Sequence, residues 1–242
     1  MAVSEKSLRE SVLAHRRRIA DAGLGGPFTS DISVRSADSI LITPANLTTL
    51  RPASIARMPL AGEYGAWKGP AKPSSEWRIH LDILRARPDI GAVVRFQSPY
   101  ATGLAMARRP IPAAHPAVAL FGAAGVRCTI YAPAGTKDLA VLALEALGDG
   151  HAALLGNYCA LATGATLEAA FARAVELETL SRLYAIALSV GRPALLSDEE
   201  TARVGERLKA SGADIDARVA PPGKSKAVAR RPAKRKRVAR KG

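Results

Sequence analysis

The chain has 242 residues, of which 48% are hydrophobic and 23% are charged, a balance typical of a globular protein with its own core. The net charge of +14 is uneven, because eleven of the 35 Lys and Arg residues but one of the 21 acidic residues fall in 216–242. The other 24 basic and 20 acidic residues leave 1–215 nearly balanced. A chain that is disordered throughout is excluded, and the basic character belongs to the tail.

The composition also bears on compartment. Two cysteines, Cys128 and Cys159, are too few for a disulfide framework and fit a reducing environment. Residues 1–11 are polar and have no apolar core of a secretory signal. The two longest uncharged stretches, 110–126 and 150–167, contain prolines, or glycines and polar residues, that do not suit a membrane span. We therefore expect a soluble, cytoplasmic protein with no membrane partner.

The spacing of apolar residues predicts helices and strands that alternate along the chain. Expected helices cover 4–21, 74–87, 99–107, 136–147, 166–190 and 197–210. Expected strands cover 31–34, 39–42, 90–97, 127–131 and 152–157. The stretch 51–73 is rich in Pro, Gly and Ala and is expected to be a loop. These elements predict one α/β domain over 1–212, followed by a disordered basic tail over 213–242 that has too few large apolar residues to fold.

Helix-capping residues support several of these boundaries. Ser74 and Ser75 are expected to cap the helix that ends before Pro88, and Thr136 the helix after it. Ser197 with Glu200 has the spacing of a capping box.

Several short motifs follow one another in order over about 8–200. The segment 72–80 reads KPSSEWRIH at the start of a predicted helix. The other motifs are Gly23-Leu24, Asp31–Val34, Ile42–Pro44, Ala86–Asp89, Ser98–Thr102, Arg109–Pro112 with His115, Gly135-Thr136, Gly148-Asp149, Leu154-Leu155 and Asn157.

This ordered set resembles the class II aldolase and adducin head family. The resemblance implies a three-layer α/β/α fold with a largely antiparallel central sheet, usually assembled as a homo-oligomer. It also implies a divalent metal, typically zinc, that is held by three histidines and polarises a substrate carbonyl while a glutamate moves the proton. The implied substrates are sugar phosphates.

The sequence departs from this pattern at the implied metal ligands. Counted from the Ser98 motif, the two strand histidines of the family are replaced by Arg95 and Gln97, and the third is replaced by Tyr158. A guanidinium has no lone pair to offer a cation, and its charge repels one. A zinc site of the family's geometry is therefore not expected, and we predict no bound metal cofactor.

Among the other residues implied by the resemblance, Glu76, Ser74 and Ser75 each allow a functional and a structural interpretation. Glu76 matches the acid/base glutamate, but a first-turn glutamate is also favoured by the helix dipole. Ser74 and Ser75 match phosphate-contacting serines and could equally be simple caps. Thr29 and Ser30 lie in the second phosphate loop, which reads PFTSD over 27–31 and ends on Asp31, an anion that would repel phosphate.

The four histidines are not expected to bind metal, because they lack a common ligand spacing. His15 is expected to be solvated on the first helix. His80 and His115 are expected to serve in packing or hydrogen bonding.

Three functions remain open. The preferred one is a divergent family member without metal-dependent aldolase activity, acting as a binding or structural module. The second is a carbon–carbon lyase or epimerase acting on a sugar phosphate or related hydroxy-carbonyl compound. It would use Glu76 as acid/base, Arg95 in place of the metal, Tyr158 as proton donor and Gln97 as a substrate contact. The third is a nucleic-acid-associated protein, because the eleven basic residues of 217–242 can neutralise phosphates without base stacking.

Overall fold

The structure is a computed structural model that describes residues 4–26, 29–45, 50–122 and 124–219. Its centre is one seven-stranded sheet in the order β3-β2-β1-β4-β7-β6-β5. Neighbouring strands are antiparallel except β5 and β6, which are parallel. The strands are β1 Asp31–Ser36, β2 Ser39–Ile42, β3 Ala56–Pro59, β4 Ala92–Phe96, β5 Arg127–Cys128, β6 Ala152–Leu155 and β7 Cys159–Gly164.

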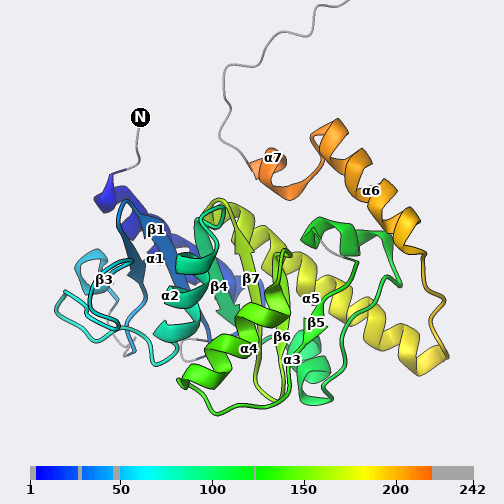
Figure 1. Cartoon of the computed structure of the whole chain (residues 1–242), viewed down its shortest axis with the longest axis horizontal. Coiled ribbons are helices and arrows are strands. Elements are labelled where there is room, and N and C mark those ends of the chain that lie inside the picture. Colours follow the sequence, from blue (N-terminus) through cyan, green and yellow to red (C-terminus); the bar gives the residue numbers. More distant parts are fainter. Residues whose placement is uncertain (1–3, 27–28, 46–49, 123, 220–242) are drawn as a thin grey trace, which may run out of the picture.

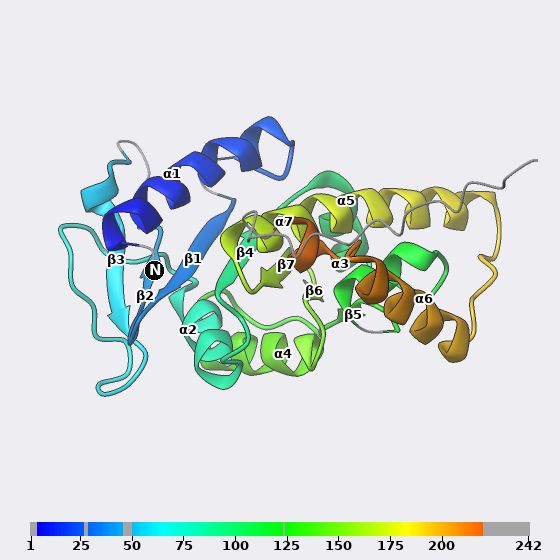
Figure 2. The same cartoon turned by 90° about the horizontal axis from the view of Figure 1, so that it is seen from above.

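Helices cover both faces of this sheet (Figures 1 and 2). The α-helices are α1 Glu5–Asp21, α2 Trp77–Ala86, α3 Pro99–Met106, α4 Lys137–Leu147, α5 Leu167–Val190, α6 Asp198–Ser211 and α7 Ile215–Val219. Two 3-10 helices, η1 Pro52–Ser54 and η2 Pro116–Phe121, lie in the connections. The predicted three-layer α/β/α architecture with a largely antiparallel sheet is confirmed.

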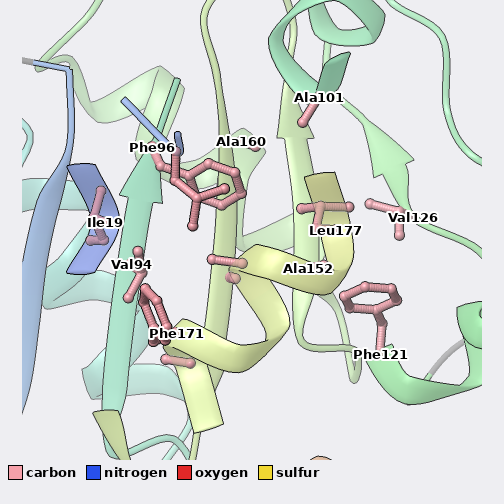
Figure 3. Packing of buried hydrophobic residues seen from close by; sticks show 14 of the residues in the cluster. Ile19, Val94, Phe96, Ala101, Phe121, Val126, Ala152, Ala160, Phe171 and Leu177 are labelled. Carbon is pink, nitrogen blue, oxygen red and sulfur yellow. The ribbon is translucent and has the colours of Figure 1, made fainter. Parts of the chain in front are cut away.

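The two faces of the sheet have separate cores because side chains alternate along each strand. On one face Val94 and Phe96 of β4 pack with α1, α3 and α5, including Phe171 and Leu177 (Figure 3). On the other face Val93 packs with the buried residues of α2 and α4. By the same alternation Arg95 shares the face of Val93, so a charged side chain lies at the end of an apolar strand on the α2 and α4 side.

Most boundaries agree with the sequence patterns. Ser4, Thr136 and Thr166 accept hydrogen bonds as N-caps of α1, α4 and α5, and Gly191 is the C-cap of α5. At Ser197 half of the predicted capping box is present, because its side chain accepts from the backbone N–H of Glu200.

Two strands were not predicted. Strand β3 lies in the stretch 51–73, which we expected to be a loop. Strand β7 lies at the centre of the sheet, between β4 and β6, where the sequence indicated no element at all. In contrast, β5 is shorter than the predicted strand 127–131 and ends at Cys128.

The folded part extends beyond the predicted boundary at residue 212. Ile215 of α7 is buried, and the Asp216 carboxylate accepts from the Arg173 guanidinium of α5 at 2.5 Å. Residues 213–219 therefore belong to the domain, whereas the rest of the predicted tail, 220–242, lies outside the described residues. No described helix is long and apolar enough to cross a membrane.

Candidate active site

The structure brings together the three residues expected to act in chemistry, which are Glu76, Arg95 and Tyr158. They lie at one end of the central strands. Arg95 is the penultimate residue of β4, and Gln97 follows that strand directly. Tyr158 lies in the tight turn that joins β6 to β7, and β7 pairs with β4. Glu76 immediately precedes α2, the helix that covers this face of the sheet.

Arg95 forms a buried ion pair with Asp31 of the neighbouring strand. The two residues are directly opposite each other in the β1–β4 ladder. The Nε–H of Arg95 donates to Asp31 Oδ2 at 2.5 Å, Nη2 contacts the same oxygen, and the side chains are 4% and 7% exposed. Burial lowers the pKa of Arg95, but the Asp31 carboxylate, with smaller contributions from Cys159 and Tyr158, raises it, and together they more than offset the burial. Arg95 is therefore a permanent cation with a built-in counter-ion.

Tyr158 lies against this cation. The Arg95 Cζ is 5.4 Å from the centroid of the Tyr158 ring, and the Gln97 amide donates to the Tyr158 backbone carbonyl at 3.1 Å. The turn that presents Tyr158 places Asn157 at a positive φ of 59°. Burial raises the pKa of the Tyr158 hydroxyl, the Arg95 charge opposes this, and the nearby Glu76 carboxylate adds to it. The hydroxyl is therefore neutral at ordinary pH and can donate a proton.

Glu76 is 1% exposed and its carboxylate is held from two sides. The Gly135 backbone N–H donates to Oε2 at 3.1 Å, and the Ser75 hydroxyl donates to Oε1 at 3.2 Å. Glu76 itself is the N-cap position of α2 and makes no side-chain capping bond. The expectation that Ser74 and Ser75 cap this helix is therefore wrong, because the helix begins at Trp77 and its N-cap position falls on Glu76.

The two serines differ in what they can offer a ligand. Ser74 is buried, and its Oγ accepts from the backbone N–H of Glu76 at 3.1 Å. Ser75 is exposed and directs its hydroxyl to Glu76. Of these two serines, Ser75 is the one that a ligand can reach.

In the described part of the second predicted phosphate loop, the side-chain hydroxyls form hydrogen bonds with the backbone of the loop itself. Thr29 Oγ1 accepts from the Gly26 backbone N–H at 2.7 Å, and Ser30 Oγ donates to the Gly26 carbonyl at 3.2 Å. Arg16 of α1 donates to both the carbonyl and the hydroxyl of Ser30 at 2.7 Å. These hydroxyls hold the turn, whereas Pro27 and Phe28 of the same loop lie outside the described residues.

The residues at this site do not fit the metal that the family resemblance implies. The positions that would hold it carry a guanidinium, an amide and a protonated phenol, and none of these is a ligand that zinc favours. The thiol of Cys159, next in the chain, is also unsuited, because burial raises its pKa to about 12. Nowhere in 4–26, 29–45, 50–122 and 124–219 do three or more His, Cys, Asp or Glu residues gather in a way that could hold a metal ion.

The histidines have separate structural roles. His80 is fully buried beside Ser33, with Nδ1 2.8 Å from the hydroxyl, and His115 Nδ1 accepts from the Ala117 backbone N–H at 3.1 Å. Both agree with the predicted packing or hydrogen-bonding roles. The expectation of a solvated His15 is wrong, because it is 7% exposed and Nε2 lies 3.0 Å from a Glu168 carboxylate oxygen.

Two contacts of this site were missed by the sequence analysis. Asp31 was noted as an anion that would repel phosphate, not as the partner of Arg95. Complementary charges in two predicted strands were the available signal, but the pairing of those strands was unknown. The Gly135 N–H that holds Glu76 left no signal, since any residue except proline supplies a backbone donor.

Comparisons with known proteins agree with this fold. A sequence model described as the class II aldolase and adducin N-terminal domain matches residues 10–185. A 5-methylthioribulose-1-phosphate/5-deoxyribulose-1-phosphate aldolase from Rhodospirillum rubrum is 42% identical over 211 residues, which cover 86% of this chain and 94% of the relative. An L-fuculose phosphate aldolase from Escherichia coli is 36% identical over 197 residues, covering 80% of this chain and 90% of the relative.

A solved structure leads to the same result. An L-fuculose 1-phosphate aldolase superimposes with a TM-score of 0.80 and 32% identity, covering 86% of this chain and 98% of that one. With a family match over most of the folded part and relatives that align along nearly their whole length, the chain belongs to the class II aldolase and adducin N-terminal domain family.

Proposed function

We propose that this chain cleaves a carbon–carbon bond in a phosphorylated keto sugar or related hydroxy-carbonyl compound, without a bound metal. The observation that carries the proposal is the cluster of Glu76, Tyr158 and Arg95. It supplies a buried carboxylate, a neutral proton donor and a fixed cation, with Tyr158 in contact with both Glu76 and Arg95. The relatives named above are aldolases that act on ketose phosphates, which supports this substrate class.

The chemistry needs a base, an acid and a positive site. Glu76 takes the proton from the substrate hydroxyl next to the bond that breaks. The electrons of that bond pass to the carbon next to the substrate carbonyl, and an enediolate and an aldehyde form. The enediolate carbon then takes a proton. Arg95 donates N–H bonds to the developing oxyanion, and the Tyr158 hydroxyl gives its proton to the enediolate carbon. Glu76 then passes the proton that it took to the Tyr158 oxygen, which restores both groups.

A ligand-binding module without turnover is the second candidate. The observation that favours it is the Asp31–Arg95 pair, which already balances the charge that would stabilise an oxyanion. The relatives named above lend this candidate no support, because each carries the name of an aldolase.

The test is a turnover assay with ketose 1-phosphates, such as 5-deoxyribulose 1-phosphate and fuculose 1-phosphate, in which the released aldehyde is measured. Glu76→Gln should reduce turnover by roughly a hundredfold or more, because the amide cannot accept the proton. Glu145→Gln, on the exposed surface of α4, should leave turnover unchanged. Substrate binding with no product from the unmodified chain would favour the binding module. Equal rates for Glu76→Gln and the unmodified chain would refute the role of Glu76.

A further inference from the structure

Asp31 is the one carboxylate in direct contact with Arg95 among the described residues of the site. The β1–β4 ladder places the two residues opposite each other, so their side chains leave the same face of the sheet side by side. Both are buried, and both contacts of the guanidinium fall on the same oxygen, Asp31 Oδ2.

This pairing fixes the orientation of the guanidinium. An arginine has five N–H donors in a rigid plane, and Asp31 takes those on the Nε and Nη2 edge. With that edge held, the Arg95 Cζ stands 5.4 Å from the Tyr158 ring centroid, so the guanidinium lies against the phenol ring. A guanidinium without this clamp would have the freedom of a long, flexible side chain.

The pairing also balances the charge at this position. A phosphate or carboxylate approaching Arg95 would meet the Asp31 carboxylate next to it and Glu76 across the site, and two like charges at close range repel strongly. Arg16 of α1 donates to the carbonyl and hydroxyl of Ser30 and also acts electrostatically on Asp31 and Arg95, so a second guanidinium stands near this pair. A carbonyl or hydroxyl oxygen can accept an N–H from Arg95 without displacing Asp31.

We propose that Asp31 is a positioning residue. It holds the Arg95 guanidinium beside Tyr158 and balances its charge, so that the ligand group meeting Arg95 is an uncharged carbonyl or hydroxyl oxygen. The part about the ligand rests on the proposed function, because it assigns the reacting end of that substrate to Arg95 and its phosphate to another place. The part about charge and orientation stands without any turnover.

The test uses inorganic phosphate as the probe, measured by calorimetry on the full chain. Asp31→Asn removes the counter-ion and keeps the side-chain size, so the association constant for phosphate should rise about tenfold or more. Asp31→Asn with Arg95→Met should lose this gain, because the freed cation is then absent. Asp38→Asn is the matched control. Asp38 also pairs with an arginine, Arg57 at 3.0 Å, but on the exposed surface, so its loss should leave phosphate binding unchanged.

A second measurement needs no variant to fold. In the unmodified chain labelled with 15N-arginine, the Nε–H resonance of Arg95 should not move as phosphate is added, because Asp31 occupies that edge. A saturable shift of this resonance would overturn the proposal. So would Asp31→Asn without a gain in phosphate binding, or a gain that persists when Arg95 is methionine. Turnover enters none of these outcomes, so a failure here is distinct from a failure of the proposed lyase activity.

Discussion

At the scale of single residues, the buried imidazole of His80 makes stability depend on pH. Burial lowers the pKa of His80 from 6.5 to about 4, with Asp31 opposing and Arg95 adding to the effect. The folded chain therefore binds this proton less well than the unfolded chain does. The stability it contributes is full above pH 6.5 and is lost as the pH falls through 4. One pKa unit corresponds to about 1.4 kcal/mol, so the loss approaches roughly 3 kcal/mol.

We predict that in His80→Asn the free energy of unfolding falls less steeply as the pH is lowered from 6.5 to 4. Urea unfolding at several pH values measures this slope. The asparagine amide can keep a hydrogen bond to Ser33, while it takes up no proton in this range. His115→Gln, on the surface, should show the same pH dependence of the free energy of unfolding as the unmodified chain. Because burial also lowers the pKa of His151 to about 4, part of this pH dependence should remain in His80→Asn. An unchanged slope in His80→Asn would contradict the assignment.

At the scale of elements, α3 is anchored by a carboxylate from another helix. Glu178 of α5 accepts from the backbone N–H groups of Tyr100 and Ala101 at 3.0 and 2.9 Å and from the Ser98 hydroxyl at 2.5 Å. The first N–H groups of a helix have no partner within it, and a negative charge is favoured there. Since α3 follows β4 directly, this contact also supports the strand end that carries Arg95.

We predict that Glu178→Ala lowers the free energy of unfolding by about 1–3 kcal/mol, because it leaves these donors unpaired. Glu176→Ala, two residues earlier on the same helix, should cost less than about 1 kcal/mol. Urea unfolding of the two variants measures the difference. Equal losses would show that Glu178 does not anchor α3.

The elements also show what a sequence can predict here. Helices with clear caps, such as the one at Thr136, and the strand ending near Gln97 were predicted close to their observed positions. The central strand β7 was missed because its residues, Cys159–Gly164, are mostly small and all buried. Strands that are buried on both faces lose the polar and apolar alternation that identifies them, and alanine and glycine have low strand propensity.

The candidate site was predicted in part for a related reason. Glu76, Arg95 and Tyr158 were identified from the order of motifs, and the structure brings them together. The Asp31–Arg95 pair was not predicted, because it depends on the pairing of two strands that are 64 residues apart in the chain. Strand pairing over such a separation leaves no local pattern.

At the scale of the whole molecule, the basic tail and the domain are separate in composition. Asp216 is bound to Arg173 and α7 packs on α5, so a truncation that preserves the domain should follow Val219. Residues 220–242 contain ten Lys and Arg residues and no acidic residue. Such a segment binds polyanions by releasing their counterions.

We predict weak DNA and RNA binding without sequence preference, which falls steeply between low and moderate salt and is lost on truncation after Val219. No aromatic residue occurs in 220–242, so base stacking cannot add selectivity. Fluorescence anisotropy with two unrelated DNA sequences at two salt concentrations measures this. Binding that survives the truncation would place the site on the domain instead.

The proposal that this class II aldolase family site works without a metal can be tested on the purified chain. The metal content of the purified chain is measured by elemental analysis, and turnover of 5-deoxyribulose 1-phosphate is measured in the same sample with and without a strong chelator. The presence of Arg95, Gln97 and Tyr158 at the implied ligand positions predicts far less than one equivalent of zinc, manganese or cobalt. It also predicts turnover that the chelator does not change. A stoichiometric metal that survives dialysis, or turnover that the chelator abolishes and zinc restores, would contradict the claim.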